Sequence, residues 1–420
     1  MSTKNVLELI SSIDKFPIER TIVPQNQLDL VNRNRTSLFP WRGQFSPELI
    51  ELLLSKYTDI DSVVVDPFVG SGTTLFEAAR RSLTCFGAEI NPAAVEMSRT
   101  VHFANVPPPG REKYLKRAKM IIEQNLSSSH RDLFSFQDKG SGQITLLPLE
   151  DTFVHILHEA SEDPFVYNIV MNSIMSNMLV QNNEPGKLLE MYNKHASIVR
   201  MLPYSRQPCK VFHCDARDIP LDTESVGFIV TSPPYINVFN YHQNYRGIME
   251  LADWDLLQVA KSEIGSNRKN RGNRFLTVIQ YSIDMLQALQ EMRRIISSKG
   301  RIVIVIGRVS KVRGIRFENY RLLSTLAAGG AGLRLICRQE RKFVNRFGKT
   351  IYEDLLHFTP IEEFSLASDS FSRNVALCFL KEALDETTDS IRQDTMSAIE
   401  NINDVTASPM FYKESTRFIK

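Results

Sequence analysis

The fold is decided by residues 63–74, which read VVVDPFVGSGTT. The apolar start of this stretch predicts a buried strand, and Gly70 and Gly72 let the backbone turn sharply and a ligand approach closely. A helical pattern follows over residues 75–81. Free N–H groups at the start of such a helix favour an anionic or carboxylate-bearing ligand. No lysine follows the glycines, which excludes a phosphate-binding P-loop.

Two further strands are predicted, and each ends in an acid. Residues 84–92 carry Glu89 at the end of a strand, 17 residues after Gly72. An acid at this position can accept both hydroxyls of a ribose; the alternative is a solvated glutamate at a strand end. Residues 210–218 form a strand that ends in acids, of which Asp215 is the first. The succession of strand, glycine-rich turn, helix and further strands predicts an α/β fold.

A second motif, TSPPY at residues 231–235, follows the apolar run of residues 226–230. The run predicts a buried strand, and the prolines stop the strand and stiffen the backbone just past its end. In open α/β sheets, ligands bind at that end of the strands. A rigid loop with a hydroxyl, free carbonyls and an aromatic face suits a flat, hydrogen-bonding group such as a nucleobase. Taken alone, the motif is also typical of an ordinary turn.

An irregular loop precedes the first strand and contains Trp41, within the sequence FPWRGQFSPE at residues 39–48. Ser46 as N-cap, Pro47 at the first helical position and Glu48 in the first turn predict a helix that runs to residue 56. The tryptophan has two interpretations, a binding-site residue or a side chain that only packs in the core.

The second half of the chain has a clear order of elements. Residues 275–297 predict an amphipathic helix, and residues 301–307 predict a buried strand. Two strands, 333–341 and 350–358, flank a polar turn and predict a β-hairpin. Helices are also expected over residues 317–328, 371–384 and 388–402.

The composition is that of an ordinary globular protein, with 420 residues, 43% hydrophobic and 23% charged. Because the net charge is only +2, a nucleic acid would have to bind a local basic face. The five cysteines show no C-x-x-C spacing, which argues against a zinc site or a disulfide framework and fits a reducing cytoplasm. The N-terminus lacks the apolar core of a signal peptide, and no run approaches the roughly 20 apolar residues of a membrane span. We therefore expect a cytoplasmic protein without membrane segments.

Shifts in composition divide the chain into five parts. Residues 107–207 break the α/β pattern after the PPPG of residues 107–110, and an insertion of this size is either a recognition unit or a lid. The expected organisation is an N-terminal arm (1–33), the cofactor-binding first part of the core (34–106), a mainly helical insertion (107–207), the catalytic second part of the core (208–360) and a C-terminal helical appendage (361–420).

Two basic clusters are candidates for contacts to nucleic acid. The first lies in the helix predicted over residues 111–124, and a solvated charged face explains it equally well. The second, which we call the basic loop, is residues 261–274, where cations alternate with Asn, Ser and Gly. Such a loop suits phosphate contacts, and a plain surface loop is the alternative. The cations of the basic loop are Lys261, Arg268, Lys269, Arg271 and Arg274.

Together these motifs resemble those of the amino-methylating DNA methyltransferases, which modify cytosine N4 or adenine N6. DPFVGSGTT at residues 66–74 is similar to the family's cofactor loop, and TSPPY at residues 231–235 is similar to its catalytic motif. Residues 39–48 are similar to the motif that contacts the methionine part of S-adenosylmethionine. The resemblance covers about 34–100 and 208–360. It implies a Rossmann-like methyltransferase core, a mostly parallel sheet with a C-terminal β-hairpin, interrupted by a helical insertion.

The resemblance also implies roles for particular residues. Glu89 is expected to hold the ribose of S-adenosylmethionine, and Asp215 is expected to accept from the adenine amino group. In the catalytic motif, Ser232 and the carbonyl of Pro233 are expected to hydrogen-bond the target amine, and Tyr235 to stack on the base. The expected cofactor-binding residues are Thr36, Phe45, Asp66, Phe68, Gly70, Gly72, Thr73, Glu89, Ile90, Asp215, Ala216 and Thr231, and the expected catalytic residues are Ser232, Pro233, Pro234 and Tyr235.

Serine at position 232 is the form usual for cytosine-N4 enzymes, whereas aspartate is more usual for adenine-N6 enzymes. The leading expectation is a site-specific cytosine-N4 DNA methyltransferase of a restriction-modification system. Its substrate would be double-stranded DNA, and a cognate restriction endonuclease is a candidate partner. The alternatives are an adenine-N6 enzyme, an RNA base methyltransferase and a DNA-binding partner that has lost catalysis.

This chemistry requires neither a metal ion nor a cysteine nucleophile. Pro208 and Cys209 are similar to the Pro-Cys of cytosine-C5 methyltransferases, whose cysteine attacks the ring. Here, however, the dipeptide opens the strand that leads to Asp215, at the wrong end for the active site. An ordinary buried cysteine is therefore expected at position 209.

Overall fold

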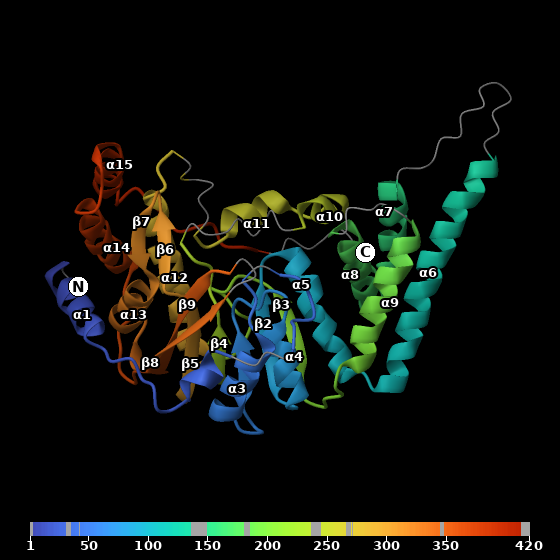
Figure 1. Cartoon of the computed structure of the whole chain (residues 1–420), viewed down its shortest axis with the longest axis horizontal. Helices are drawn as coiled ribbons and strands as arrows, with labels where there is room; N and C mark the ends of the chain where they lie inside the picture. Colours follow the sequence, from blue (N-terminus) through green and yellow to red (C-terminus); the bar gives the residue numbers. More distant parts are fainter. Residues whose placement is uncertain are drawn as a thin grey trace.

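A seven-stranded sheet forms the centre of the molecule (Figure 1). The computed structural model describes residues 3–30, 35–41, 43–135, 149–179, 185–236, 245–265, 270, 272–344 and 348–412. The strands lie in the order β3 (Cys209–His213), β2 (Thr84–Glu89), β1 (Val63–Asp66), β4 (Val226–Thr231), β5 (Ile296–Gly307), β9 (Thr350–Pro360) and β8 (Leu333–Val344).

The first five strands of this order pair in parallel, and β9 pairs antiparallel with both β5 and β8. The α/β fold with a mostly parallel sheet and a C-terminal β-hairpin is therefore confirmed. The chain leaves β1 toward β2 and β3 on one side, and β4 and β5 follow on the other. The strand order thus reverses between β1 and β4, which is where open α/β sheets bind ligands.

Alternating side chains of the central strands pack against helices on both faces of the sheet. Val64 and Phe228 belong to a core shared with α3 (Pro47–Tyr57), α4 (Thr73–Arg80) and α5 (Pro92–Arg99). Their neighbours Val65 and Ile229 belong to the opposite core, which is shared with α12 (Leu276–Ile295) and α13 (Asn319–Gly330). Because both faces are covered, the strands read as continuous apolar runs rather than as an alternation of apolar and polar residues.

The helical segment after α5 packs beside the sheet at the β3 edge (Figure 1). It begins with a 3₁₀ helix at Thr100–Asn105 and contains α6 (Pro108–Ser135), α7 (Leu149–Ala160), α8 (Pro164–Leu179) and α9 (Pro185–Met201). The side chain of Arg111 is fully buried where this segment begins and ends. Its guanidinium donates to the carbonyl oxygens of Val106, Leu202 and Pro203 at 2.6 to 3.0 Å. Arg111 therefore joins the two ends of the segment.

Smaller elements complete the other side of the molecule. Helices α1 (Thr3–Asp14), α14 (Asp369–Leu384) and α15 (Asp389–Glu400) gather with α13 beyond the β8–β9 hairpin (Figure 1). A two-stranded ribbon, β6 (Val309–Val312) and β7 (Ile315–Glu318), lies between β5 and α13 in the chain. The remaining helices are α2 (Gln25–Leu28), α10 (Arg246–Leu251) and α11 (Leu256–Ser262). No helix among the described residues is both long and apolar enough to cross a membrane.

Candidate active site

Asp66, at the end of β1, joins the two sequence motifs. Its Oδ1 accepts a hydrogen bond from the Thr231 hydroxyl at 2.6 Å, and its Oδ2 accepts from the Thr74 hydroxyl at 2.6 Å. The N–H of Phe68 also donates to Oδ1, at 3.1 Å. Burial raises the pKa of Asp66 to about 6, although these hydrogen bonds oppose the shift. One carboxyl group therefore fixes the glycine loop after β1 against the start of the TSPPY loop after β4.

The glycine loop requires its glycines for two separate reasons. Gly70 and Gly72 have φ angles of +51° and +95°, a region that side chains disfavour. A Cβ atom on Gly72 would lie 2.9 Å from the Cα of Ser98, and one on Gly70 would lie 3.1 Å from Nε1 of Trp41. The loop can therefore pack tightly against α5 and against Trp41 only because it carries glycine at these positions.

Glu89 lies at the end of β2, beside the glycine loop. Its Oε1 accepts from the N–H groups of Ile90 and Asn91 at 3.0 and 2.8 Å, and its Oε2 accepts from the N–H of Gly70 at 3.0 Å. Burial raises the pKa of Glu89 to about 7, while these three N–H groups act in the opposite direction. A protonated and an ionised carboxyl group are therefore both accessible near neutral pH.

One pocket runs along the carboxyl ends of the strands and brings together most of the residues predicted to bind the cofactor or to act in catalysis. It encloses about 870 Å³ of space, counting the open solvent at its mouth. The predicted residues that line it are Phe45, Phe68, Gly70, Thr73, Glu89, Ile90, Asp215, Ala216, Ser232 and Pro234.

The other predicted residues occupy different positions. Asp66, Gly72, Thr231 and Pro233 are not among the residues that line the pocket, and neither is Thr36, which is exposed. The side chain of Tyr235 lies close to the side chain of Ser232 and to the backbone of Gly307. A Cβ atom on Gly307 would lie 2.9 Å from the Tyr235 ring, so the ring packs directly on that glycine. Burial raises the pKa of Tyr235 above its ordinary value.

The carboxylate of Asp215 is fully engaged with protein groups. Its Oδ1 accepts from the backbone N–H and from Nε of Arg217 at 3.0 and 2.8 Å. Its Oδ2 accepts from the Arg217 guanidinium at 2.7 Å and from the backbone N–H of Phe411 at 3.0 Å. A carboxylate offers about four acceptor positions, so an adenine amino group that bonds to Asp215 would have to displace or share one of these donors.

Several pocket residues lie outside the set of residues expected to bind the cofactor or to act in catalysis. Trp41, Gln44, Cys214 and the stretch 262–264 also line the pocket. Trp41 stacks on Tyr245 with ring centroids 6.1 Å apart, so the tryptophan packs against another ring and also faces the pocket. The stretch 262–264 was hidden from sequence reasoning because it lies within the basic loop, where the surrounding cations point to DNA contacts instead. Of the basic-loop cations, Lys261 and Arg274 are exposed, and Arg268, Lys269 and Arg271 lie outside the described residues.

The pocket has a composition that fits S-adenosylmethionine. Its described lining includes the acids Glu89, Asp215 and Glu263 and no Lys, Arg or His. A nucleotide with phosphate groups would be repelled by these acids, whereas a cofactor that carries a sulfonium and an ammonium group would be attracted. Phe45, Phe68 and other apolar residues supply surface for an adenine ring and a methionine chain. Among the described residues, no group of three His, Cys, Asp or Glu side chains is arranged to hold a metal ion.

Comparison with known proteins gives matches of limited extent. Residues 21–100 match the family model described as DNA methylase. A stretch of 55 residues is 34% identical to the type II methyltransferase M.MjaII of Methanocaldococcus jannaschii, covering 13% of this chain and 10% of that protein. The chain thus matches about a tenth of the length of this curated relative.

Solved structures of methyltransferases are also similar to this chain, with low TM-scores. An S-adenosylmethionine-dependent methyltransferase from Methanosarcina mazei has 10% identity and a TM-score of 0.34, covering 74% of this chain and 98% of that one. The rRNA methyltransferase aviRa from Streptomyces viridochromogenes has 12% identity and a TM-score of 0.29, covering 81% and 96%.

The match over residues 21–100 contains the glycine loop, Glu89 and α3. These are the elements that form the first half of the pocket, together with Trp41 and Phe45. Residues 21–100 are therefore similar to the DNA methylase family over the elements that form the first half of the pocket.

Proposed function

We propose that the protein transfers a methyl group from S-adenosylmethionine to the N4 amine of cytosine in DNA. The observation that carries this proposal is the position of the TSPPY loop. Ser232 and Pro234 line the same pocket as Gly70 and Glu89, so the amine-binding loop and the cofactor loop lie on one cavity. Transfer between two bound groups requires this proximity, because positioning supplies much of the rate of an in-line displacement.

The chemistry that the chain must supply concerns the amine, because S-adenosylmethionine itself supplies an electrophilic methyl group. The lone pair of an exocyclic amine is delocalised into the base, so the amine is a poor nucleophile. Ser232 Oγ and the Pro233 carbonyl oxygen would accept its two N–H groups, which favours a pyramidal nitrogen and the positive charge that grows during attack. Because the side chains of Ser232 and Tyr235 lie close together, the Ser232 hydroxyl could donate its hydrogen bond to Tyr235 and leave its lone pairs free to accept from the amine.

The target cytosine must leave the stack of the duplex to reach this loop. Extrusion costs a few kcal/mol, and stacking on Tyr235 would offset part of that cost. We propose that the exposed Lys261 and Arg274 contact phosphates near the pocket. We also propose that residues 107–207 contribute to target recognition, because α6 to α9 form a separate layer beside the sheet (Figure 1).

The relative M.MjaII is named a type II methyltransferase, which supports a role in a restriction-modification system with a partner endonuclease. The preference for cytosine N4 over adenine N6 rests on serine rather than aspartate at position 232. The identity of the methylated base tests this preference directly.

Mass spectrometry of DNA nucleosides gives that test. The protein is expressed in a host without DNA methylation, and N4-methylcytosine is expected in the digested DNA. N6-methyladenine instead would overturn the cytosine assignment, and methylated bases only in RNA would overturn the DNA assignment. No methylated base at all, from protein that binds S-adenosylmethionine, would contradict the catalytic proposal.

Ser232→Ala tests the role proposed for the catalytic loop, and Cys209→Ala is its control. Loss of one oriented hydrogen-bonding group in a transition state typically costs about 10²- to 10³-fold in rate, and we expect a loss of that size with the affinity for S-adenosylmethionine unchanged. Cys209→Ala should retain full activity, because Cys209 is buried at the start of β3. Full activity of Ser232→Ala would show that the proposed mechanism is wrong.

A further inference from the structure

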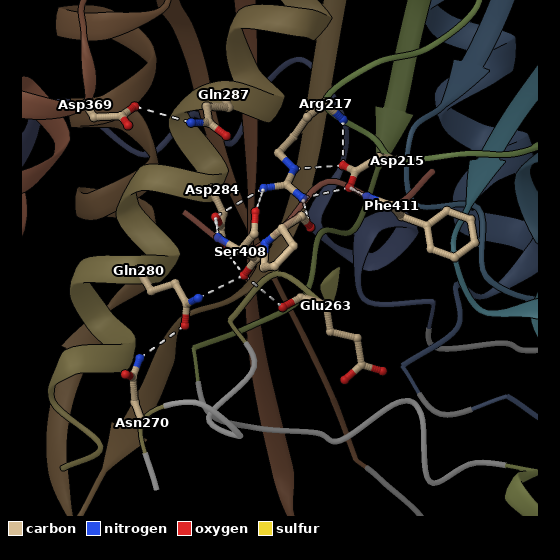
Figure 2. A network of polar contacts seen from close by, with 11 residues as sticks. Asp215, Arg217, Glu263, Asn270, Gln280, Asp284, Gln287, Asp369, Ser408 and Phe411 are labelled. Carbon is tan, nitrogen blue, oxygen red and sulfur yellow. Dashed lines mark hydrogen bonds and ion pairs between the residues drawn. The ribbon is translucent and has the colours of Figure 1, made fainter. Parts of the chain in front are cut away.

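Phe411, near the end of the described chain, contacts the end of β3 in two ways. Its backbone N–H donates to Oδ2 of Asp215 at 3.0 Å, although the two residues are 196 positions apart. Its ring packs on the ring of His213, the last residue of β3, with centroids 4.8 Å apart. Figure 2 shows the Phe411 ring extended away from the charged side chains around Arg217. Phe411 is only 6% exposed, so both contacts are shielded from water.

His213 connects the Phe411 ring to the wall of the pocket. Its Nε2 lies 3.0 Å from the carbonyl oxygen of Ile90, and Nε2 must carry the proton there because a carbonyl oxygen only accepts. Ile90 lines the pocket, as does Glu89. His213 is also the partner of Glu89 across the parallel strands β2 and β3. A shift of the His213 ring would therefore disturb the backbone that carries two residues of the pocket.

Asp215 lines the pocket as well, and Phe411 holds it directly. Three of the four donors described for its carboxylate are groups of Arg217, only two residues away. The fourth is the N–H of Phe411, which comes from a distant part of the chain. A buried carboxylate that accepts on both oxygens loses hydrogen bonds if it rotates, and that loss is costly. Phe411 therefore helps to fix the orientation of Asp215 relative to the pocket.

The segment that carries Phe411 is anchored on both sides. Before Phe411, the N–H and the hydroxyl of Ser408 donate to Asp284 of α12, both at 2.7 Å. After it, the carbonyl oxygen of Tyr412 accepts from Nε2 of Gln258 in α11 at 2.7 Å. The contacts of Phe411 with the end of β3 are therefore made by a fixed backbone.

The pocket residues that Phe411 holds suit a purine. Ile90 offers an apolar side chain to a flat ring, and Asp215 offers a carboxylate to its polar edge. Adenine presents an amino group to such a carboxylate, whereas hypoxanthine presents a carbonyl oxygen that the carboxylate repels. Because a carboxylate has about four acceptor positions, the amino group would share an oxygen with one of the protein donors. The orientation of the carboxylate therefore decides how well the two purines are distinguished.

We propose that Phe411 is a positioning residue for adenine recognition. Its N–H holds Asp215, and its ring holds Ile90 through His213, in the arrangement that binds the adenine of S-adenosylmethionine. This proposal rests on the proposed function, which assigns S-adenosylmethionine to the pocket. It extends the cofactor site to a segment beyond residue 360, outside the part of the sequence that resembles the methyltransferases.

Calorimetry with S-adenosylhomocysteine and S-inosylhomocysteine tests the proposal, because the second compound carries a carbonyl oxygen in place of the adenine amino group. The wild type should bind the adenosyl compound at least about tenfold more tightly, the typical size for a hydrogen bond to a charged group. In Phe411→Ala this ratio should fall below about threefold. Phe411→Tyr, which keeps the ring, should retain the wild-type ratio.

The ratio separates positioning from simple destabilisation, because a loss of folded protein weakens the apparent binding of both compounds equally. If Phe411→Ala does not fold, Phe411→Leu fills most of the space without an aromatic ring and should also lower the ratio. His213→Leu should lower it too, since this variant removes the bond to Ile90. The Phe411 and His213 replacements together should lower the ratio no further than the stronger single replacement, because both act through one path.

Tyr412→Ala is the matched control, since Tyr412 is 62% exposed and its bond to Gln258 is made by the backbone. This control should retain the wild-type ratio. A wild-type ratio in a folded variant that lacks the Phe411 ring would overturn the proposal. Equal binding of the two compounds by the wild type would also overturn it, because there would be no adenine recognition to position. If the wild type binds neither compound, the assignment of S-adenosylmethionine itself fails.

Discussion

At the scale of single residues, Asp66 explains why two loops from distant parts of the sequence form one site. Thr231 lies 165 positions after Asp66, yet its hydroxyl donates to Asp66 across adjacent parallel strands. The hydrogen bond is buried, so removing the hydroxyl leaves an acceptor without its partner. Thr74 makes the equivalent bond on the cofactor side. Asp66 is therefore a positioning residue for both loops.

Thr231→Val should lower the free energy of unfolding by about 1 to 3 kcal/mol, because it removes the hydroxyl and keeps the shape. Thr231→Ser keeps the hydroxyl and should lose less. Urea unfolding of the three proteins measures the difference. Equal losses in the two variants would mean that packing of the Thr231 methyl group, rather than the bond to Asp66, stabilises the loop.

Glu89 should make cofactor binding depend on pH. Burial raises its pKa to about 7, and an ionised carboxylate accepts a ribose hydroxyl more strongly than a neutral carboxyl group. Affinity for S-adenosylhomocysteine should therefore rise as the pH increases from 6 to 8. Glu89→Gln should bind more weakly, with an affinity that stays constant over this range in calorimetry. A wild-type affinity that falls with increasing pH would contradict this role of Glu89.

At the scale of secondary-structure elements, the sequence predicts those helices and strands whose ends are set by neighbouring residues. Pro47 starts α3 as expected, and residues 84–89 form β2. The β6–β7 ribbon was missed, because its turn consists of Arg313 and Gly314, both with positive φ. The usual signals for such a turn are Asn-Gly and Asp-Gly, so residues 315–318 were not recognised as a strand before α13. Glu263 was missed as a pocket residue because it lies within the basic loop, and its carbonyl oxygen contacts Ser408, which lies 145 positions later in the chain.

The C-terminal segment 408–411 is such a long-range partner, and it holds a buried ion network. Arg217 donates to the carbonyl oxygens of Ser408 and Pro409 at 2.8 and 3.0 Å, and it pairs with Asp215 and Asp284 (Figure 2). The Arg217 side chain is almost completely buried. The segment therefore completes the hydrogen bonds of a charged group that water cannot reach.

Deletion of residues 404–420 should destabilise the protein strongly, because it removes these partners from buried charges, a change that typically costs about 3 to 5 kcal/mol. Deletion of residues 413–420 is the matched control, since it keeps every bond described for 408–411. Thermal unfolding of both proteins is the measurement. Equal melting temperatures would show that the network reorganises without the segment.

At the scale of the whole molecule, buried acids and buried histidines change the free energy of unfolding in opposite directions as the pH rises. Burial raises the pKa values of Asp66 and Asp284 to about 6 and that of Glu89 to about 7. The stabilisation from each of these acids is fully present below the pKa of the acid in the unfolded protein, near 4. It is lost as the pH rises through the folded-state pKa values of 6 to 7. Burial lowers the pKa values of His102, His195 and His357 to about 4, 3 and 3.

Each of these histidines contributes stability that is complete above its unfolded pKa of about 6.5 and is lost as the pH falls below that value. Three groups of each kind titrate in the same window, so their effects should nearly cancel. We expect the free energy of unfolding of the cofactor-free protein to change by less than about 2 kcal/mol between pH 5.5 and 7.5, since one pKa unit of one group corresponds to about 1.4 kcal/mol.

A single replacement should make the free energy of unfolding depend on pH, with a sign that depends on whether an acid or a histidine is removed. In Glu89→Gln the histidines outweigh the remaining acids, so stability should rise with pH across the window. In His195→Leu the acids outweigh the remaining histidines, so stability should fall with pH. Among the residues that the structure describes, His195 Nε2 has no hydrogen-bond partner. Replacement of His195 should therefore disturb little other than its titration. Urea unfolding at pH 5.5, 6.5 and 7.5 gives the slopes, and slopes of the same sign in both variants would show that these buried groups do not control the pH dependence.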